Sequence, residues 1–284
     1  MLYVVALASA ALYGAADFLG GIASRRTNTI AIVVISQLAG LIVLLLVLPL
    51  LPASSATRND FVWGAAAGFA GGIGVALLYR ALAIGSMAIV APITAVCAVT
   101  VPVAAAIAFG ERPGAGASAG IALAILAIVL VSQQSPPTAE AAPTSPARSS
   151  GVGIALLSGV AIGLFFLALA RTSADAGMWP LVAARSTSLG LFAALAFVTR
   201  RRVRMSRNVA SVAIAGGILD MFANVLYLVA TRYGPLSTVV TLSSLYPAST
   251  VLLARTVLGE RLNARQIAGI VCALVAVLLI VGTR

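Results

Sequence analysis

Histidine and lysine are both absent from this sequence of 284 residues, and only seven residues are Asp or Glu. Without histidine, Ser-His and Cys-His catalytic pairs cannot form, and the imidazole ligands of zinc and haem are missing. Without lysine there is no GxxxxGK[ST] loop, which disfavours ATP-driven transport by this chain. The two cysteines, Cys97 and Cys272, lie inside separate apolar stretches. We interpret them as small core residues and expect no metal and no other cofactor.

Charge of either sign is also scarce. Charged residues make up 9% of the chain and hydrophobic residues 61%, whereas about a quarter of a soluble domain is charged. Most of the outer surface must therefore face lipid, and the sequence predicts an integral membrane protein. All 18 basic residues are arginines, and most of them lie between apolar stretches, where they can contact lipid phosphates, so we expect no nucleic-acid partner. The chain is apolar from Leu2 onward, which indicates a first membrane helix and not a cleaved signal peptide.

Ten apolar stretches are long enough to cross a bilayer as helices, which takes about 20 residues each. They are Leu2–Ile22, Thr29–Leu50, Phe61–Tyr79, Met87–Phe109, Ala115–Val131, Val152–Arg171, Trp179–Thr199, Val209–Thr231, Leu236–Leu258 and Ala264–Val281. The predicted fold class is an all-α integral membrane protein with ten transmembrane helices.

One polar segment divides the chain. Residues 132–150 are rich in Pro, Ser, Thr and Ala and have no apolar period, which is typical of a flexible linker. Residues 1–131 and 151–284 are thus predicted to be two repeats of five helices each.

The two halves carry the same marker. Gly110-Glu111-Arg112 recurs 149 residues later as Gly259-Glu260-Arg261, each time between the fourth and fifth helix of its half. Because five is odd, the second half must enter the membrane from the opposite face. Inverted repeats of this kind are associated with alternating access to a site near the bilayer midplane. We interpret both glutamates as boundary and turn residues.

Asp220 is the first candidate for a functional residue. It lies near the middle of its predicted helix, where a charged side chain costs about 2.5–3.5 kcal/mol. Asn224 and Tyr227 follow at one and two turns, so the three form a polar stripe that we expect to face a substrate path. The alternative is that Asp220 only pairs with Arg185 to hold two helices together.

Asp17 and Arg80 are the next candidates, as an interior latch, a gate or a clamp for substrate. The repeat does not duplicate these charges: Phe166 lies 149 residues after Asp17, and Gly71 lies 149 residues before Asp220. The polar centre is therefore asymmetric, as expected where a site recognises a particular cargo.

Three further residues, Tyr13, Gln37 and Tyr246, are candidate lining residues of the pathway. Pro247 in the ninth predicted helix removes a backbone donor, which predicts either a kink or a broken helix. Gly64, Gly68 and Gly72 form a GxxxGxxxG face that we expect to pack against another helix.

These features resemble the drug/metabolite transporter superfamily, EamA-type. The resemblance rests on the doubled Gly-Glu-Arg triplet, the five-plus-five layout and three segments: GAADFLGG at 14–21, GILDMFAN at 217–224 and GPLSTVVTLSSLYP at 234–247. It implies a multi-pass secondary carrier in the cytoplasmic membrane, commonly an exporter of amino acids, other metabolites or toxic compounds. It does not imply a particular substrate.

We therefore favour a carrier for a small metabolite or drug, and we expect no enzymatic activity. Transport is expected to be coupled to protons through Asp17 or Asp220; the alternative is a uniporter. A lipid-modifying membrane enzyme would need clustered acids or bases, and a sensor or assembly protein would be expected to carry a soluble domain or long tail. A carrier predicts that Asp17, Arg185 and Asp220 converge on one water-accessible cavity, whereas scattered helix contacts would favour a structural role. The mostly small, apolar surroundings favour a zwitterionic or mildly amphipathic cargo over a polyanion.

The orientation of the chain has two conflicting indicators. More arginines, including those between Arg200 and Arg207, are predicted on the face opposite the termini, and the positive-inside rule would make that face cytoplasmic. The family resemblance implies cytoplasmic termini instead.

Overall fold

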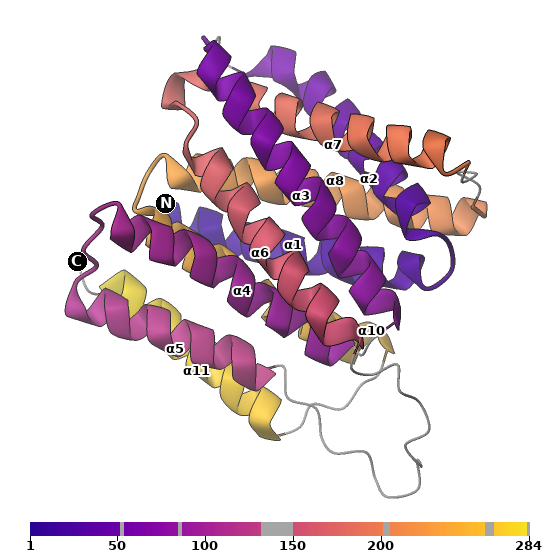
Figure 1. Ribbon diagram of the computed structural model, residues 1–284. Helices are drawn as coiled ribbons and strands as arrows, with labels where there is room; N and C mark the ends of the chain where they lie inside the picture. Colours follow the sequence, from indigo (N-terminus) through magenta and orange to yellow (C-terminus); the bar gives the residue numbers. More distant parts are fainter. Residues whose placement is uncertain (52–53, 85–86, 132–149, 201–204, 259–263, 283–284) are drawn as a thin grey trace, which may run out of the picture.

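The computed structural model describes residues 1–284 except 52–53, 85–86, 132–149, 201–204, 259–263 and 283–284, and the described residues are helical with no strand (Figure 1). Its α-helices are α1 (Leu2–Ser24), α2 (Thr29–Val47), α3 (Arg58–Ile84), α4 (Met87–Ala108), α5 (Ala115–Val131), α6 (Ser150–Ala170), α7 (Trp179–Val198), α8 (Arg207–Thr231), α9 (Leu236–Ser243), α10 (Tyr246–Leu258) and α11 (Ala264–Gly282). Two short 3-10 helices, η1 (Leu48–Leu50) and η3 (Ala174–Ala176), follow α2 and α6. The predicted linker, except Ser150, and the second Gly-Glu-Arg triplet lie outside the described residues.

The prediction of one continuous helix over Leu236–Leu258 was wrong, because the structure divides this stretch into α9 and α10. Pro247 explains the break: it has no N–H to donate to the carbonyl of Ser243, and its ring would clash with that carbonyl. The turn between the two helices is closed by the backbone N–H of Leu245, which donates to Leu242 at 3.2 Å. Helix α4 also contains prolines and remains continuous.

Six described helices are long and apolar enough to cross a membrane: α1, α2 with η1, α3, α6, α7 and α8. Their outward faces carry exposed apolar side chains such as Leu46, Phe69 and Leu157. Such side chains would be unfavourable in water and suit lipid. The chain is therefore a multi-pass membrane protein, and the count of ten spans stays a prediction.

Helix packing follows the repeat. Helix α1 packs on α8 and α10, and its counterpart α6 packs on α3 and α4. Helices α2 and α7 show the same equivalence: α2 packs on α8 of the other half, and its counterpart α7 packs on α3. The fifth helices of the two halves, α5 and α11, lie side by side (Figure 1). The two halves therefore interlock through equivalent contacts and share one interior.

Equivalent glycines allow these close helix crossings. A Cβ on Gly68 in α3 would collide with the backbone of Ala184 in α7, and a Cβ on Gly217 in α8 would collide with the backbone of Ser36 in α2. Gly68 and Gly217 are 149 residues apart, the spacing of the sequence repeat. Gly64 and its neighbours one and two turns later face α7 in the same way, which confirms the predicted packing role.

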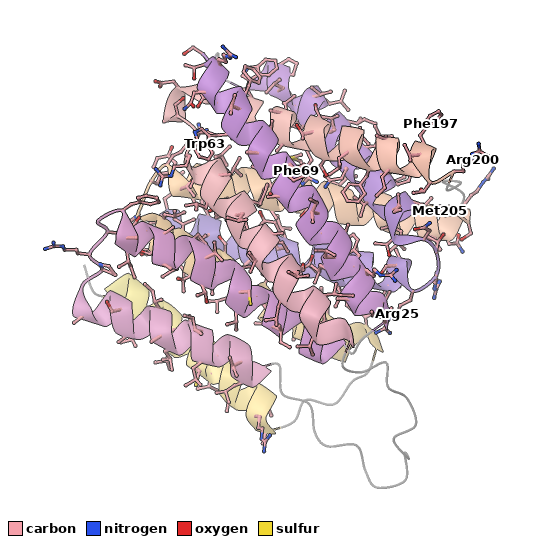
Figure 2. All side chains as sticks on the ribbon, in the orientation of Figure 1. Arg25, Trp63, Phe69, Phe197, Arg200 and Met205 are labelled. Atoms are coloured by element: carbon pink, nitrogen blue, oxygen red, sulfur yellow. The ribbon has the colours of Figure 1, made fainter. Side chains whose placement is uncertain are left out.

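The start of α1 and the end of α11 lie at one end of the bundle, which we call the terminus face (Figure 1). Arg25, after α1, and Arg200, after α7, lie at the other end, which we call the opposite face (Figure 2). Asn28 caps α2 at this face, because its side chain accepts a hydrogen bond from the backbone N–H of Ile30 at 3.0 Å.

Candidate functional site

A cavity lies between the two halves of the chain. Its lining residues are Tyr13, Asp17, Gln37, Gly68, Gly71, Gly72, Val75, Leu78, Ile162, Phe165, Phe166, Ala184, Arg185, Ser188, Asp220, Asn224 and Tyr246. The cavity volume of about 60 Å³ has room for a few water molecules. Pockets that hold drug-sized ligands measure about 300–1,000 Å³, so in this conformation the cavity is too small for such a molecule.

Arg185 is the cation of this cavity. It projects from α7 and donates one hydrogen bond to Gln37 on α2 and another to Asp220 on α8. The Arg185–Asp220 contact is the one salt bridge among the described residues. Only 7% of the surface of Arg185 is exposed, so both partners have lost most of their hydration. A buried pair of this kind compensates its own charges but adds little to stability beyond that.

Asn224 extends this polar cluster toward α1. Its amide donates to the Asp220 carboxylate at 3.2 Å, and its carbonyl oxygen accepts a hydrogen bond from the Tyr13 hydroxyl at 2.9 Å. The Tyr13 ring also meets the edge of Phe166 on α6, with ring centroids 5.8 Å apart. One hydrogen-bonded chain therefore links α1, α8, α7 and α2 across the two halves.

Three other polar side chains line the cavity without a protein partner. The Asp17 carboxylate has no hydrogen bond or salt bridge with any described residue. The hydroxyls of Ser188 and Tyr246 are buried and likewise make no hydrogen bond within the described part of the chain. An unsatisfied buried hydroxyl costs about 1–3 kcal/mol, so Ser188 and Tyr246 are suited to partners that enter the cavity.

Two of the predicted site residues lie elsewhere. Tyr227 is fully buried behind the cavity and donates its hydroxyl hydrogen to the carbonyl of Phe166 at 3.0 Å. Arg80 is exposed and lines a separate cavity of about 510 Å³ at the opposite face. It does not reach Asp17 because Tyr79 occupies the face of α3 that packs on Gly20 of α1, and the next residue of a helix is turned by about 100°.

The other seven predicted residues all line the central cavity, and the repeat identifies more that sequence reasoning did not assign. Four pairs of lining residues are separated by 149 positions: Tyr13 and Ile162, Asp17 and Phe166, Gly71 and Asp220, and Val75 and Asn224. In each pair the polar member lies on α1 or α8 and the apolar member on α3 or α6. The cavity thus has a polar wall and an apolar wall at equivalent positions of the two halves.

Comparison with known proteins gives the family. The model of the EamA-like transporter family matches residues 1–133 and 149–282. The chain belongs to the EamA-like transporter family. Its members are membrane transporters of small molecules. One crystal structure aligns with 98% of this chain and 95% of its own chain, with a TM-score of 0.73 and 14% identity, which supports the fold alone. Comparison with curated proteins gave no match.

In this EamA-like protein the two halves are fastened together at the terminus face. The Asp60 carboxylate, at the start of α3, accepts hydrogen bonds from the Ser173 backbone N–H at 2.7 Å and from the Ser173 hydroxyl at 3.1 Å. It also accepts from the Thr57 hydroxyl at 2.6 Å. Nearby, the Arg171 guanidinium stacks over the Phe109 ring at 4.0 Å from its centroid.

Arg232 supports the same loop of the second half. Its guanidinium donates to the backbone carbonyls of Ala174 and Gly177, which lie between α6 and α7. Partial burial lowers the pKa of Arg232, and the negative charges of Asp60 and Asp175 act in the opposite direction. The α6–α7 loop is therefore held by Asp60 of the first half and by Arg232 of the second half.

Glu111 forms a further contact between the halves at this face. Gly110 has φ +100°, a left-handed conformation that favours glycine, and it turns the chain after α4. The Glu111 carboxylate then accepts hydrogen bonds from the backbone N–H of Leu236 at 2.8 Å and from the Ser237 hydroxyl at 2.6 Å. It caps the first turn of α9, where a negative charge is stabilised. This confirms the interpretation of Glu111 as a boundary residue.

Proposed function

We propose that the protein is a secondary carrier that exports a small metabolite or drug through the central cavity by alternating access. The observation that supports this most is the position of the cavity: both halves line it, at equivalent residues, and a buried ion pair with unpartnered polar groups faces into it. Carriers built from inverted repeats place their substrate sites at such a junction.

The contacts at the terminus face support an alternating mechanism. Asp60 and Glu111 belong to the first half, and their partners Ser173 and Ser237 belong to the second. With these bonds made, the halves are held together at that face. In the proposed cycle residues 1–131 and 151–284 rock as two units, so that these bonds break when the cavity opens toward the termini and form again when it opens toward the opposite face.

The proposed driving force is a proton gradient. Asp17 and Asp220 both line the cavity, and a carboxyl group in an apolar site can alternate between a charged and a neutral form as access changes sides. Coupling then requires that protonation and substrate binding favour different arrangements of the halves.

The test is flux in proteoliposomes that contain the purified protein and a mixed panel of small metabolites and drugs. We expect net movement of some compound, abolished in Asp220→Asn, which keeps the size of the side chain but removes the charge that pairs with Arg185. Asp175→Asn is the matched control, because Asp175 is exposed on the α6–α7 loop, and it should transport normally. Unchanged flux in Asp220→Asn would assign Asp220 a purely structural role.

A further inference from the structure

We infer that the substrate is an amphipathic organic monocation, a small amine whose ammonium group binds Asp17 while its apolar body lies against α6. This inference rests on the proposed carrier function, because it names the chemical class of the molecule that occupies the central cavity.

The first argument is the charge balance of the cavity. Its described lining residues include three charged side chains: Asp17, Arg185 and Asp220. The guanidinium of Arg185 is already engaged by the Asp220 carboxylate and the Gln37 carbonyl oxygen. When it is ionised, the Asp17 carboxylate therefore has no cation to compensate it among the described residues. An ammonium group would restore neutrality and supply the missing hydrogen-bond donors.

The second argument is that two further hydrogen-bonding groups line the same cavity as Asp17. Ser188 and Tyr246 are 2% and 3% exposed, line the same cavity and have no hydrogen-bond partner in the described residues. A hydroxyl oxygen accepts a hydrogen bond through its lone pairs, so both groups can accept from the N–H bonds of an ammonium ion that Asp17 does not use. The carboxylate and the two hydroxyls thus offer acceptors to a donor-rich cation.

The third argument is the apolar wall beside the polar groups. Phe165 and Phe166 of α6, together with Ile162, line the cavity beside the polar residues of α1 and α8, and the Phe166 ring meets the ring of Tyr13. Aromatic rings present apolar surface and an electron-rich face that attracts a cation. A molecule with one charged end and one apolar end matches both walls, whereas a molecule that is polar throughout matches only one.

The same contacts disfavour an anion. A substrate carboxylate would need Arg185, but Asp220 already compensates the charge of that guanidinium, so a bound anion would leave the cavity with an uncompensated negative charge. It would also meet the unpaired Asp17 carboxylate in the same small cavity. Electrostatic mismatch of this kind discriminates between ligands of equal size.

The experiment compares three ligands that share one phenyl body: phenethylamine, a cation at neutral pH; phenylalanine, a zwitterion; and 3-phenylpropionate, an anion. Binding of each to the purified full chain in detergent is measured by isothermal titration calorimetry. We expect phenethylamine to bind most tightly and 3-phenylpropionate not to bind. Asp17→Asn should weaken phenethylamine binding at least about tenfold, because it removes a buried charge partner. Asp17→Glu keeps the charge and should retain binding.

Thermal unfolding checks that each variant is folded, and Asp175→Asn serves as the surface control. Equal or tighter binding of the anion or the zwitterion overturns the inference. So does an affinity for phenethylamine that Asp17→Asn leaves unchanged, or no phenethylamine binding to the parent protein at millimolar concentration. Amine binding without flux in proteoliposomes would contradict the carrier function and leave the ligand class standing. Flux of an anion without amine binding would contradict the ligand class and leave the carrier function standing.

Discussion

Arg185 on α7 and Asp220 on α8 form a buried ion pair inside the central cavity, and Gln37 on α2 shares the guanidinium. Because α2 belongs to the first half and α7 and α8 to the second, a single cation joins the two halves near the middle of α8. Separation of the halves at this depth must break or exchange the Arg185–Gln37 bond, whereas the Arg185–Asp220 pair lies within the second half. Mutations of this pair can therefore test whether it stabilises the fold or supports transport.

Removing one member of the pair should destabilise the protein more than removing both. Arg185→Met leaves the Asp220 carboxylate without a cation to pair with, and breaking a buried pair in this way costs about 3–5 kcal/mol. The double variant Arg185→Met with Asp220→Leu leaves no unpaired charge and should recover most of that loss. The measurement is denaturant unfolding in detergent micelles, arranged as a double-mutant cycle. Additive losses would show that the two side chains do not interact.

Bulk at the helix crossings should be tolerated only where the structure leaves space. Gly68→Val and Gly217→Val each place a side chain against the backbone of a neighbouring helix, so each should destabilise by about 2 kcal/mol or more. Gly190 in α7 has nothing near its Cβ position, so Gly190→Ala should leave stability unchanged or raise it slightly. Thermal unfolding of the three variants tests this, and equal behaviour of Gly68→Val and Gly190→Ala would contradict the described crossing.

Loss of the Asp60 carboxylate should loosen the terminus face. Asp60→Ala removes the acceptor of the Ser173 backbone N–H and of two hydroxyls, and hydrogen bonds to a charged group contribute about 1.5–3 kcal/mol each. We expect the amide of Ser173 to exchange at least about tenfold faster with deuterated solvent, measured by mass spectrometry of the α6–α7 loop. Asp175→Asn, in the same loop, should exchange like the parent. Identical exchange in Asp60→Ala would show that other contacts hold this face closed.

Collapse of the proton gradient should stop concentrative transport. If Asp17 or Asp220 takes up and releases the coupled proton, an ionophore that equalises pH across proteoliposomes should abolish accumulation while exchange of substrate across the membrane continues. The readout is the accumulation of labelled substrate with and without an imposed pH gradient. Accumulation that does not respond to the gradient would identify a uniporter or a carrier coupled to another ion.

Much of this architecture could be predicted from the sequence, because membrane helices need long apolar stretches and because the repeat leaves a fixed offset. The offset of 149 between the Gly-Glu-Arg triplets also relates Gly68 to Gly217 and Asp17 to Phe166. If this offset had been applied to every polar candidate residue, the equivalent apolar lining residues of the cavity would have been identified. The break after α9 was not predicted as such, because Pro247 is compatible with a kink as well as with a break.

The directions in which side chains point were harder to predict from the sequence than the helices themselves. Asp17 and Arg80 have comparable predicted depths in their helices, but their pairing depends on which face of α3 packs on α1. Tyr79 takes that face through its contact with Gly20, and the sequence alone does not specify such a contact. Ser188 carried a usable signal that was overlooked, since it follows Arg185 by about one turn of α7 and therefore lies on the same face.

The central claim is that one cavity, shared by the two halves, is exposed in turn to each side of the membrane. The most direct test is labelling of Ser188→Cys with a charged, membrane-impermeant maleimide added from one side at a time, in protein in which Cys97 and Cys272 are replaced by alanine. Gly190→Cys on the same helix is the control, because that position faces away from the packed interior. Our account predicts labelling of Ser188→Cys from both sides, slowed by bound substrate, and no labelling of Gly190→Cys. Labelling from only one side during active flux, or from neither side, would contradict it.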